Sequence, residues 1–529
     1  MRKVVPRVES RKVFANKASG SFLTHIDCGR GDTLALLCGR DALVVIFLSS
    51  SAPPSVSYFV GFNEVAMRFV RVFVAAVMVL FLSKHVFAQS ADSAVPRAMT
   101  TTEKAAMAEK VKAEALRSWE AYKKYAWGHD ELHPLSKKPF DWYGSTLLMT
   151  PIDALDTLTV MGLKPQADEA RTLIDTKLNL DQDIYVKDFE ITIRLLGALL
   201  SNYELTGDKR LLELADELGR RMLPMFNSPT GMPYEYVNLH TGAVRGTKSN
   251  PAEIGSLLIE YGMLARHTGK QEYYDKAKRA LVELYKRRSP IGLVGSEIDV
   301  ETGKWSDPTA GIMGGIDSYY EYLLKAAILF GDQDCAKMWR DSETAIDKYL
   351  ADRRPDGLWY GYADMNTGAR THTFYGSLDA FFPAVLVLGG DARQAADLQD
   401  SSYKMWNLAG VEPEQLDYAK MQITAANYEL RPEIIESTYY LYHSTHDAKY
   451  LAMGQTYFDA LHKYCRTDEA YAALADVRTK KQKDSMESFF FAETLKYLYL
   501  LFAPESTLPF DSVIFNTEAH PMQRSAGLK

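Results

Sequence analysis

Apolar and polar positions form a block pattern along the chain, and this pattern predicts a series of helix pairs. In each pair a strongly apolar segment ends at a short turn, and a segment with apolar residues on one face follows. Glycine before Asp or Lys is typical of a helix end followed by a new helix start. The turns are 45 to 62 residues apart, a spacing that suits a helical hairpin plus a connection, and they lie at Met161–Leu163, Thr206–Asp208, Thr268–Lys270, Phe330–Asp332, Gly389–Asp391 and Thr445–Asp447.

The apolar segments are expected to be inner helices, because a helix that is apolar on all sides belongs in a protein interior. The one-sided segments that follow the turns are expected to pack outside them. The amphipathic segment 102–125 can supply the outer partner that the last inner helix lacks, and it would close the ring. We therefore predict an all-α fold, an (α/α)7 barrel spanning residues 100–523 as one domain, in preference to an open solenoid. Its inner helices are expected at 145–161, 189–206, 251–267, 313–330, 374–388, 430–445 and 485–502.

Three connections resemble β-hairpins with similar turns, at Leu239–Gly242, Val300–Gly303 and Met365–Gly368. Aromatic and β-branched residues flank them, which favours strands. Each hairpin precedes an inner helix. We therefore expect all three on the same rim of the barrel.

A basic and then apolar segment near the N-terminus predicts export. Met67–Arg71 is basic, Val72–Leu82 is apolar, and the small residues Val86 and Ala88 fit the signal-peptidase pattern. The apolar run is shorter than a comfortable bilayer span, which disfavours a membrane anchor. The prediction is a signal peptide at 67–88 and a secreted or periplasmic protein. Residues 1–66 are then expected to be a misassigned or disordered extension.

Charge and cysteine content narrow the possible partners. Residues 1–88 carry 11 Lys and Arg and 5 Asp and Glu, so the remainder has a net charge of −13. An acidic surface argues against nucleic acids and anionic membranes as partners. Only Cys335 and Cys465 remain after processing at Ala88. They could form one disulfide or remain two buried thiols.

Acidic residues recur at the start of the predicted inner helices. Glu190 and Glu253 open the second and third, Asp317 sits in the first turns of the fourth, and Glu433 and Glu436 open the sixth. Acids favour helix N-termini for electrostatic reasons, so each one alone has a structural explanation. Inner helices of such a barrel run in the same direction, however. Their N-terminal ends share one mouth, where the acids should converge.

A set of acids among apolar neighbours needs a further explanation, because burying each one is costly. Crowded carboxylates raise one another's pKa, so that one can hold a proton while another acts as a base. Arg194 and Arg431 can balance part of the charge. Aromatic residues crowd the same positions and could stack on sugar rings. Acids with aromatics indicate carbohydrate chemistry.

Seven long segments resemble glycoside hydrolase family 47, the class I α1,2-mannosidases. The resemblance covers about residues 105–523, nearly all of the predicted mature chain. The matching segments follow in family order. They are Tyr125–Leu132, Asp153–Leu158, Phe189–Arg194, Asp317–Lys325, Leu430–Ser437, Ser488–Tyr497 and Asn516–Pro521.

The resemblance implies an (α/α)7 barrel and an inverting exo-α-mannosidase that removes terminal α1,2-linked mannose from high-mannose glycans. In such an enzyme two carboxyl groups flank the scissile bond, and a water molecule attacks the anomeric carbon. By resemblance Glu433 is the general base and Glu190 the general acid, acting through a water molecule. Asp317 is the competing candidate for the acid. Contacts with substrate are expected from Arg194, Glu253, Arg431, Glu436, Phe489 and Glu493.

The resemblance also implies a Ca²⁺ cofactor bound by the backbone carbonyl and the hydroxyl of Thr517. Water molecules would complete the shell, and an all-oxygen shell suits this hard cation. The acids expected to hold those waters are Glu433, Glu436, Glu493 and Glu518. Without the resemblance, Thr517 would be interpreted as an ordinary turn residue.

Three segments depart from the trimming enzymes of the family and are similar to its ER degradation-enhancing mannosidase-like branch: Arg288–Leu293, Gly311–Ile316 and Tyr375–Pro383. This similarity leaves the linkage preference open. The signal peptide looks bacterial, which would make the substrate a foreign glycan. The alternative function is a mannose-glycan-binding protein on the same fold with little turnover. The joint presence of Glu190, Asp317, Glu433 and Thr517 favours the enzyme.

Overall fold

The computed structural model describes residues 98–524 in full and, between residues 15 and 60, the backbone of five short strands. The chain divides into two units, Met1–Val95 and Pro96–Lys529. In the first unit, β1 (Ala15–Asn16), β2 (Ser21–Asp27), β3 (Thr33–Cys38), β4 (Ala42–Ser49) and β5 (Ala52–Val60) pair antiparallel in sequence order. The predicted signal peptide at 67–88 lies outside the described residues.

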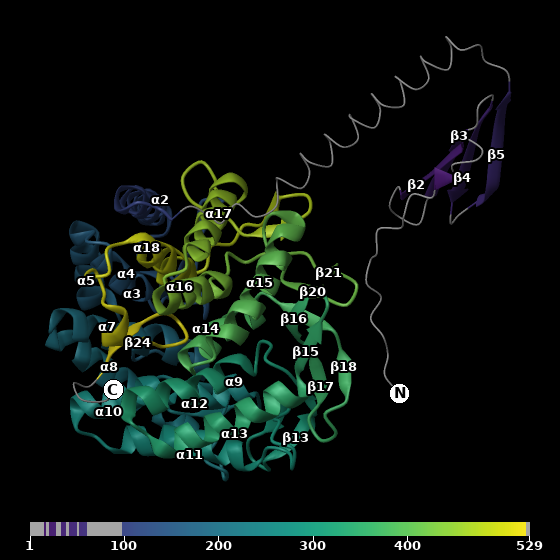
Figure 1. Ribbon diagram of the computed structural model, residues 1–529. Coiled ribbons are helices and arrows are strands. Elements are labelled where there is room, and N and C mark those ends of the chain that lie inside the picture. Colours follow the sequence, from purple (N-terminus) through teal and green to yellow (C-terminus); the bar gives the residue numbers. More distant parts are fainter. Residues whose placement is uncertain are drawn as a thin grey trace. The chain divides into compact units, whose positions relative to one another are not determined.

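The second unit is the predicted (α/α)7 barrel. Within residues 98–524 seven outer helices alternate along the chain with seven inner segments, and Figure 1 shows them arranged in a ring with α5 and α11 at its margin. The outer helices are α2 (Thr101–Ala126), α5 (Lys164–Lys177), α8 (Lys209–Met222), α11 (Glu272–Lys286), α13 (Gln333–Tyr349), α15 (Ala392–Ala409) and α17 (Ala448–Tyr464).

Most inner segments are interrupted rather than continuous helices. They are α3 (Met149–Asp153) with α4 (Leu155–Val160); α6 (Asp188–Glu190), the π-helix η1 (Ile191–Leu196) and α7 (Gly197–Thr206); α9 (Pro251–Gly255) with α10 (Leu258–Thr268); α12 (Asp317–Phe330); η3 (Leu378–Phe381) with α14 (Phe382–Leu388); α16 (Glu433–Thr445); and the π-helix η4 (Phe490–Leu495) with α18 (Lys496–Phe502).

Several inner segments begin later than predicted. Residues 374–376 form strand β19 (Phe374–Gly376), which pairs with β20 (Gln415–Asp417), so the helical segment starts only at Leu378. Leu430 has a positive φ of 64°, which excludes it from a right-handed helix, and α16 therefore starts after Pro432.

The predicted turns separate the paired helices as expected. Gly207, Gly269 and Gly331 end α7, α10 and α12 in the left-handed conformation, which glycine adopts at low cost. Asp208 then caps α8 by accepting a hydrogen bond from the backbone N–H of Arg210. Asp332 caps α13 in the same way. The Gly-Asp pairs thus end one helix and start the next.

The ring is closed by its first helix and its last inner segment. α2 packs against α18, and η4 packs against α4, so the seventh inner segment contacts the first. α2 contributes the buried residues Trp119 and Tyr122, whose rings lie 5.4 Å apart. This closure confirms the barrel over the open solenoid.

Hairpins connect outer helices to the inner segments that follow them. The three predicted hairpins are β9 (Tyr236–Asn238) with β10 (Val244–Arg245), β12 (Glu297–Asp299) with β13 (Lys304–Asp307), and β17 (Tyr362–Asp364) with β18 (Arg370–His372). Four further hairpins were not predicted from the sequence: β6 (Glu131–His133) with β7 (Lys138–Phe140), β15 (Ala351–Arg354) with β16 (Gly357–Tyr360), β20 with β21 (Gln422–Ala425), and β22 (Leu474–Asp476) with β23 (Lys481–Gln482). Four further strands, β8 (Tyr185–Lys187), β11 (Lys248–Ser249), β14 (Thr309–Ala310) and β19, each add to one of these hairpins.

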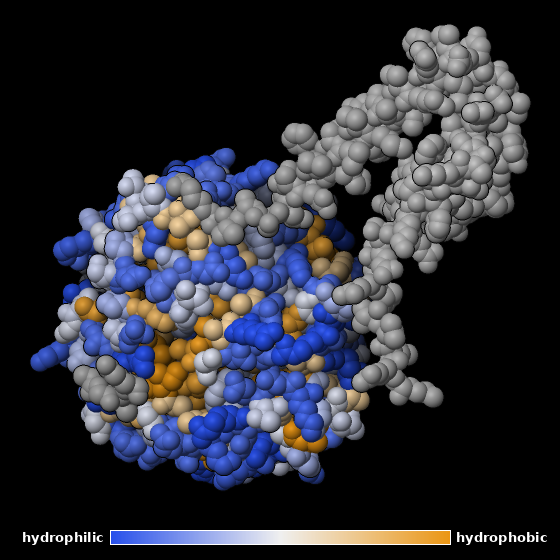
Figure 2. All heavy atoms as spheres, viewed as in Figure 1, coloured by the Kyte–Doolittle hydropathy of each residue, from blue (hydrophilic) through white to orange (hydrophobic). Residues whose placement is uncertain are grey.

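A last hairpin, β24 (Val513–Phe515) and β25 (Pro521–Gln523), follows the barrel and carries the loop Asn516–His520. Figure 2 shows a mainly hydrophilic face, on which apolar side chains are visible near the position of β24 and α12 in Figure 1. The hairpin loop contacts the inner segments from inside the barrel, as the ion pairs below show.

Cys335 and Cys465 are both buried and free, so the two-thiol alternative holds and the disulfide does not form. Among the described residues, no helix is both long enough and apolar enough to cross a membrane.

Candidate active site

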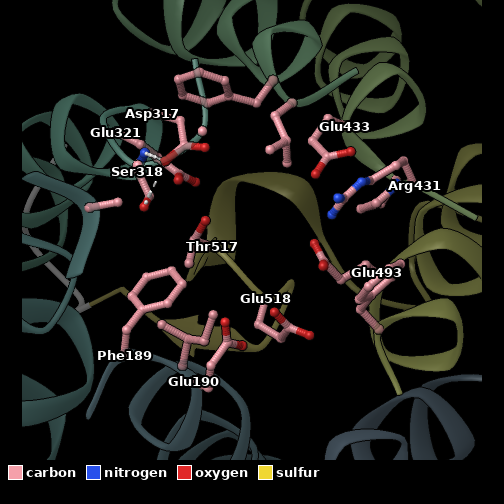
Figure 3. Close-up of a pocket in the computed structure, with 18 of the residues that line it drawn as sticks. Phe189, Glu190, Asp317, Ser318, Glu321, Arg431, Glu433, Glu493, Thr517 and Glu518 are labelled. Atoms are coloured by element: carbon pink, nitrogen blue, oxygen red, sulfur yellow. Dashed lines mark hydrogen bonds between the residues drawn. The ribbon is translucent and has the colours of Figure 1, made fainter. Parts of the chain in front are cut away.

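A cavity of about 270 Å³ lies where the inner segments begin. Six of the seven inner segments supply lining residues, and the loop Asn516–His520 supplies Thr517 and Glu518. Figure 3 shows Thr517 between Asp317 on one side and Glu433 on the other, with Glu190 and Glu518 below. The common direction of the inner helices therefore brings their N-terminal acids together.

The structure places every site residue proposed from the sequence in this one cavity. The set comprises Glu190, Arg194, Glu253, Asp317, Arg431, Glu433, Glu436, Phe489, Glu493, Thr517 and Glu518. These residues are far apart along the chain. The contact between Arg194 and Glu518, for example, joins residues 324 positions apart.

Glu433 can gain or lose a proton near neutral pH. Burial raises its pKa to about 7, against the opposing effect of Arg431. Its Oε2 atom is buried and has no hydrogen-bond partner among the described residues. Arg431 is in turn held by Glu414, with 2.8 Å between Nη2 and Oε1. A carboxylate with one free oxygen beside a fixed guanidinium can accept a proton from water.

Asp317 faces the same cavity with a different set of neighbours. Burial raises its pKa to about 7, while the Ser318 backbone N–H, which donates to Oδ1 at 2.8 Å, opposes the shift. Glu321, one turn further along α12, raises the pKa further. A carboxyl group with this pKa is protonated in a large fraction of molecules at neutral pH and can act as an acid.

Glu190 is bound to Arg194 and is partly exposed. The Nε atom of Arg194 donates to Glu190 Oε2 at 2.9 Å, and Nη1 contacts Glu518. The Arg194 guanidinium also lies 5.5 Å from the centre of the Phe489 ring. Arg431 lies 5.7 Å from the centre of the same ring. Two cations therefore lie near Phe489 within an acidic site.

Two π-helices orient residues of the site. η1 carries Arg194, and η4 carries Glu493. A π-helix turn adds a residue to the helical repeat and rotates the following side chains, and such turns are frequent at functional sites. The interruptions of the inner segments are therefore located where side chains must point into the cavity.

Glu321 is a site residue that sequence analysis did not select. It lines the cavity and pairs with Lys325, which also lies 3.7 Å from Glu436. Burial raises the pKa of Glu436 to about 8, and Lys325 opposes the shift. The spacing could have indicated Glu321, because residues four apart on a helix share a face and Asp317 was already selected.

Glu253 lies at the edge of the acidic group. Its Oε1 atom is 2.6 Å from the ammonium group of Lys187, and Ser249 donates a hydrogen bond to Oε2. The side chain of Asn250 caps α9 by accepting the Glu253 N–H. These contacts fix the carboxylate at the rim of the cavity.

The oxygen atoms around Thr517 suit a hard cation. Within the described part of the chain, neither the hydroxyl nor the carbonyl oxygen of Thr517 takes part in a hydrogen bond, and only its N–H is engaged, by the hydroxyl of Tyr322. Burial raises the pKa of Glu493 and of Glu518, and the charge of Glu518 adds to the shift at Glu493. Arg194 offsets only part of this repulsion, and crowded carboxylates of this kind fit a divalent cation.

Direct ligation by several side chains is not the arrangement found. Among the described residues, no group of three or more His, Cys, Asp or Glu side chains is close enough to hold a metal ion. Thr517 oxygens with the acids at a distance fit an ion whose remaining ligands are water molecules.

Comparisons with known proteins agree with this geometry. Residues 114–524 match the model of glycosyl hydrolase family 47. The chain is 37% identical to alpha-mannosidase I MNS5 of Arabidopsis thaliana over 448 residues, covering 79% of this chain and 77% of the relative. It is also 37% identical over 453 residues to the human ER degradation-enhancing alpha-mannosidase-like protein 2, covering 79% and 78% of the two chains.

A solved structure agrees as well. The alpha-1,2-mannosidase from Trichoderma reesei superposes with a TM-score of 0.74 at 28% identity, covering 79% of this chain and 99% of that one. The family match spans most of the chain and includes every segment that lines the cavity. The chain therefore belongs to glycosyl hydrolase family 47 and is a glycoside hydrolase of the α-mannosidase family.

Proposed function

We propose that this chain is a calcium-dependent exo-α-mannosidase that removes terminal α1,2-linked mannose from high-mannose glycans with inversion of configuration. The observation that carries the proposal is the pairing of Asp317 and Glu433 in one cavity, each with a pKa raised to about 7. One can hold a proton while the other is ionised, as a two-carboxyl glycosidase requires.

The size of the cavity supports action on a chain end. A cavity volume of about 270 Å³ suits a terminal sugar rather than the middle of a long glycan. Phe489 offers an apolar ring close to two arginines, and the acids around it can accept hydrogen bonds from sugar hydroxyls. These contacts select a small, hydroxyl-rich ring.

Glu433 serves as the base in this mechanism. Ionised Glu433 accepts a proton from a water molecule, and the water attacks the anomeric carbon from the side opposite to the leaving sugar. Arg431 favours the ionised form of Glu433. The attack inverts the anomeric centre, so an α-linked substrate gives β-mannose first.

Asp317 is our preferred proton donor for the leaving oxygen. Its raised pKa keeps the proton available near neutral pH. Glu190 is the alternative proton donor. It is less favoured because Arg194 occupies one of its oxygens, so that the proton would have to pass through a water molecule. The two assignments differ in their response to the leaving group.

Calcium is proposed as the cofactor on the basis of the donor set. Thr517 would hold the ion through its hydroxyl and carbonyl oxygens, and Glu433, Glu436, Glu493 and Glu518 would hold the waters around it. A bound Ca²⁺ would offset the repulsion between the carboxylates and anchor the hydroxyls of the sugar. The family match agrees with this cofactor.

The α1,2 linkage is proposed from the solved relative, whose description is alpha-1,2-mannosidase. The relative named ER degradation-enhancing alpha-mannosidase-like protein 2 supports a mannose-containing glycan as the substrate class. We further propose that residues 67–88 direct export, that the mature protein starts near Gln89 and that it acts outside the cytoplasm.

The deciding experiment incubates the protein with a high-mannose glycan, with and without a chelator, and determines product mass and linkage. Loss of one or more terminal α1,2-linked mannoses only in the presence of calcium is the expected result. Binding of the glycan without any released mannose would instead identify a mannose-binding protein on this fold.

A further inference from the structure

The loop Asn516–His520 has a conformation that needs support from outside. Asn516 Oδ1 accepts the backbone N–H groups of Glu518 and His520, at 3.0 and 2.7 Å. Between them Ala519 has a φ of +58°, a left-handed conformation that costs free energy for a residue with a Cβ atom. Surrounding contacts must therefore hold this turn.

The imidazole of His520 supplies the first of these contacts. Its Nδ1 atom lies 2.7 Å from Asp156 Oδ2, and its Nε2 atom lies 3.0 Å from Asp153 Oδ1. All three side chains are fully buried. Because each ring nitrogen faces a carboxylate oxygen, both nitrogens act as donors, and the ring is an imidazolium between two carboxylates.

Both carboxylates continue into further ion pairs. Asp156 lies 2.7 Å from the Nζ atom of Lys496, which also donates to the carbonyl oxygen of Ala519 at 2.6 Å. Asp153 lies 3.8 Å from Nη1 of Arg194, the guanidinium that holds Glu190 and Glu518. The charges alternate in sign along Glu190, Arg194, Asp153, His520, Asp156 and Lys496.

These pairs connect the loop to three inner segments. Asp153 and Asp156 belong to the first inner segment, Arg194 to η1 and Lys496 to α18. The backbone also approaches closely: a Cβ atom on Gly197 would lie 2.7 Å from Asn516 Nδ2 and 2.9 Å from His520 Cδ2. The loop is therefore seated directly on the start of α7.

We propose that His520 is a positioning residue, which through Asp153 and Asp156 holds the loop so that the oxygens of Thr517 and the carboxylate of Glu518 face the cavity before an ion binds. The role of Thr517 as the calcium ligand rests on the proposed function. The fixed shape of the loop is independent of that function. Side chains that hold ligands in place in this way raise metal affinity by limiting what must be ordered on binding.

The test compares His520→Gln with His443→Gln in the full chain. His443 is a half-buried histidine in the last turn of α16, and its ring stacks on Phe510. Calcium affinity is measured by titration calorimetry of chelator-treated protein, and amide hydrogen exchange of residues 517–519 is measured without metal. We expect His520→Gln to weaken calcium binding roughly 10–100-fold and to speed loop exchange. The control should change neither.

A milder variant covers the case in which His520→Gln does not fold. Ser201 donates a hydrogen bond to Asp156 Oδ2 at 2.8 Å, so Ser201→Ala loosens the clamp without leaving a buried charge unpaired. Ser201→Ala should change the calcium affinity and the amide exchange of the loop in the same direction as His520→Gln, but by a smaller factor.

The positioning role would be overturned if His520→Gln lowered only the melting temperature and left the calcium affinity and the loop exchange unchanged. If the wild-type protein binds no calcium, the cofactor proposal fails separately. In that case loop exchange in the metal-free protein decides the role of His520: faster exchange in His520→Gln supports it, and wild-type exchange refutes it.

Discussion

At the scale of single residues, Glu433 and Asp317 have the same raised pKa for partly different reasons. Burial is the main cause for both, but Arg431 stabilises ionised Glu433, whereas Glu321 disfavours ionised Asp317. Arg431 lowers the pKa of Asp317 as well, and Asp317 raises that of Glu433, so variants must test which group is the base and which the acid. Because the two groups influence each other, the pH dependence will report values that belong to the pair.

Replacing the base tests the mechanism most directly. Glu433→Gln keeps the shape of the side chain but cannot accept the proton, so we expect kcat to fall by roughly 10²–10⁴-fold while glycan binding survives. Proton NMR of the first product of the wild-type enzyme should show β-mannose. Initial α-mannose, or a wild-type rate in the variant, would contradict the assignment.

The pH profile tests the acid. With both pKa values at about 7, kcat/KM should be bell-shaped with a maximum near neutral pH. Activity falls below the maximum because Glu433 gains a proton, and it falls above the maximum because Asp317 loses one. Rates are measured between about pH 5 and 9 on a glycan and on an aryl mannoside with a good leaving group.

Asp317→Asn should lose far more activity on the glycan than on the aryl mannoside, because only the glycan needs the proton. Glu190→Gln provides the matched comparison. If Glu190→Gln shows the stronger leaving-group dependence, Glu190 is the acid.

At the scale of elements, the outer helices are set by local signals. Asp447 is exposed and caps α17 by accepting the N–H of Lys449 at 2.9 Å. His446 ends α16 in the left-handed conformation with a φ of 54°. The turn between α16 and α17 is thus defined by adjacent residues, as the sequence predicted.

Removing this cap should affect stability alone. Asp447→Ala is expected to lower the free energy of unfolding by about 1 kcal/mol, because the first turn of α17 loses a hydrogen-bond acceptor. Asp459→Ala, at an exposed position within the same helix, is the control and should cost less. Chemical denaturation measures both variants. A change in kcat for Asp447→Ala would mean that α17 influences the cavity.

The inner segments are less predictable than the outer ones. Sequence analysis treated them as continuous helices, but π-helices and short breaks interrupt most of them. Apolar periodicity cannot distinguish a regular from a π-helical turn inside a core, because every face is apolar. The breaks follow from packing around the cavity.

At the scale of the whole molecule, the proposed ion would lie where six inner segments and the C-terminal loop meet. A chelator should therefore abolish activity and also lower the melting temperature, because the ion stabilises only the folded arrangement. Calcium should restore both better than magnesium, which prefers a small octahedral shell. Full activity after exhaustive chelation would exclude calcium.

Processing is the second prediction at this scale. The basic, apolar and small residues of 67–88 predict that protein exported from its native host begins at or near Gln89. N-terminal sequencing of the exported protein checks this. Finding residues 1–66 on the exported protein would refute the signal peptide.

The sequence by itself determined the helix pairs, their turns and the acids at the starts of four inner helices. Gly207, Gly331 and Asp332 act on their immediate neighbours, so their effect is visible locally. The family resemblance supplied Thr517, which no local pattern distinguishes from an ordinary turn residue.

Only the tertiary structure decided how these acids are paired and protonated. Contacts such as Arg194 with Glu518 and His520 with Asp153 join residues more than 300 positions apart. The pKa of a carboxyl group depends on its burial and its neighbours in space. The raised pKa of Glu433, the role of Glu321 and the clamp around His520 arise only when the ring closes and removes these groups from water.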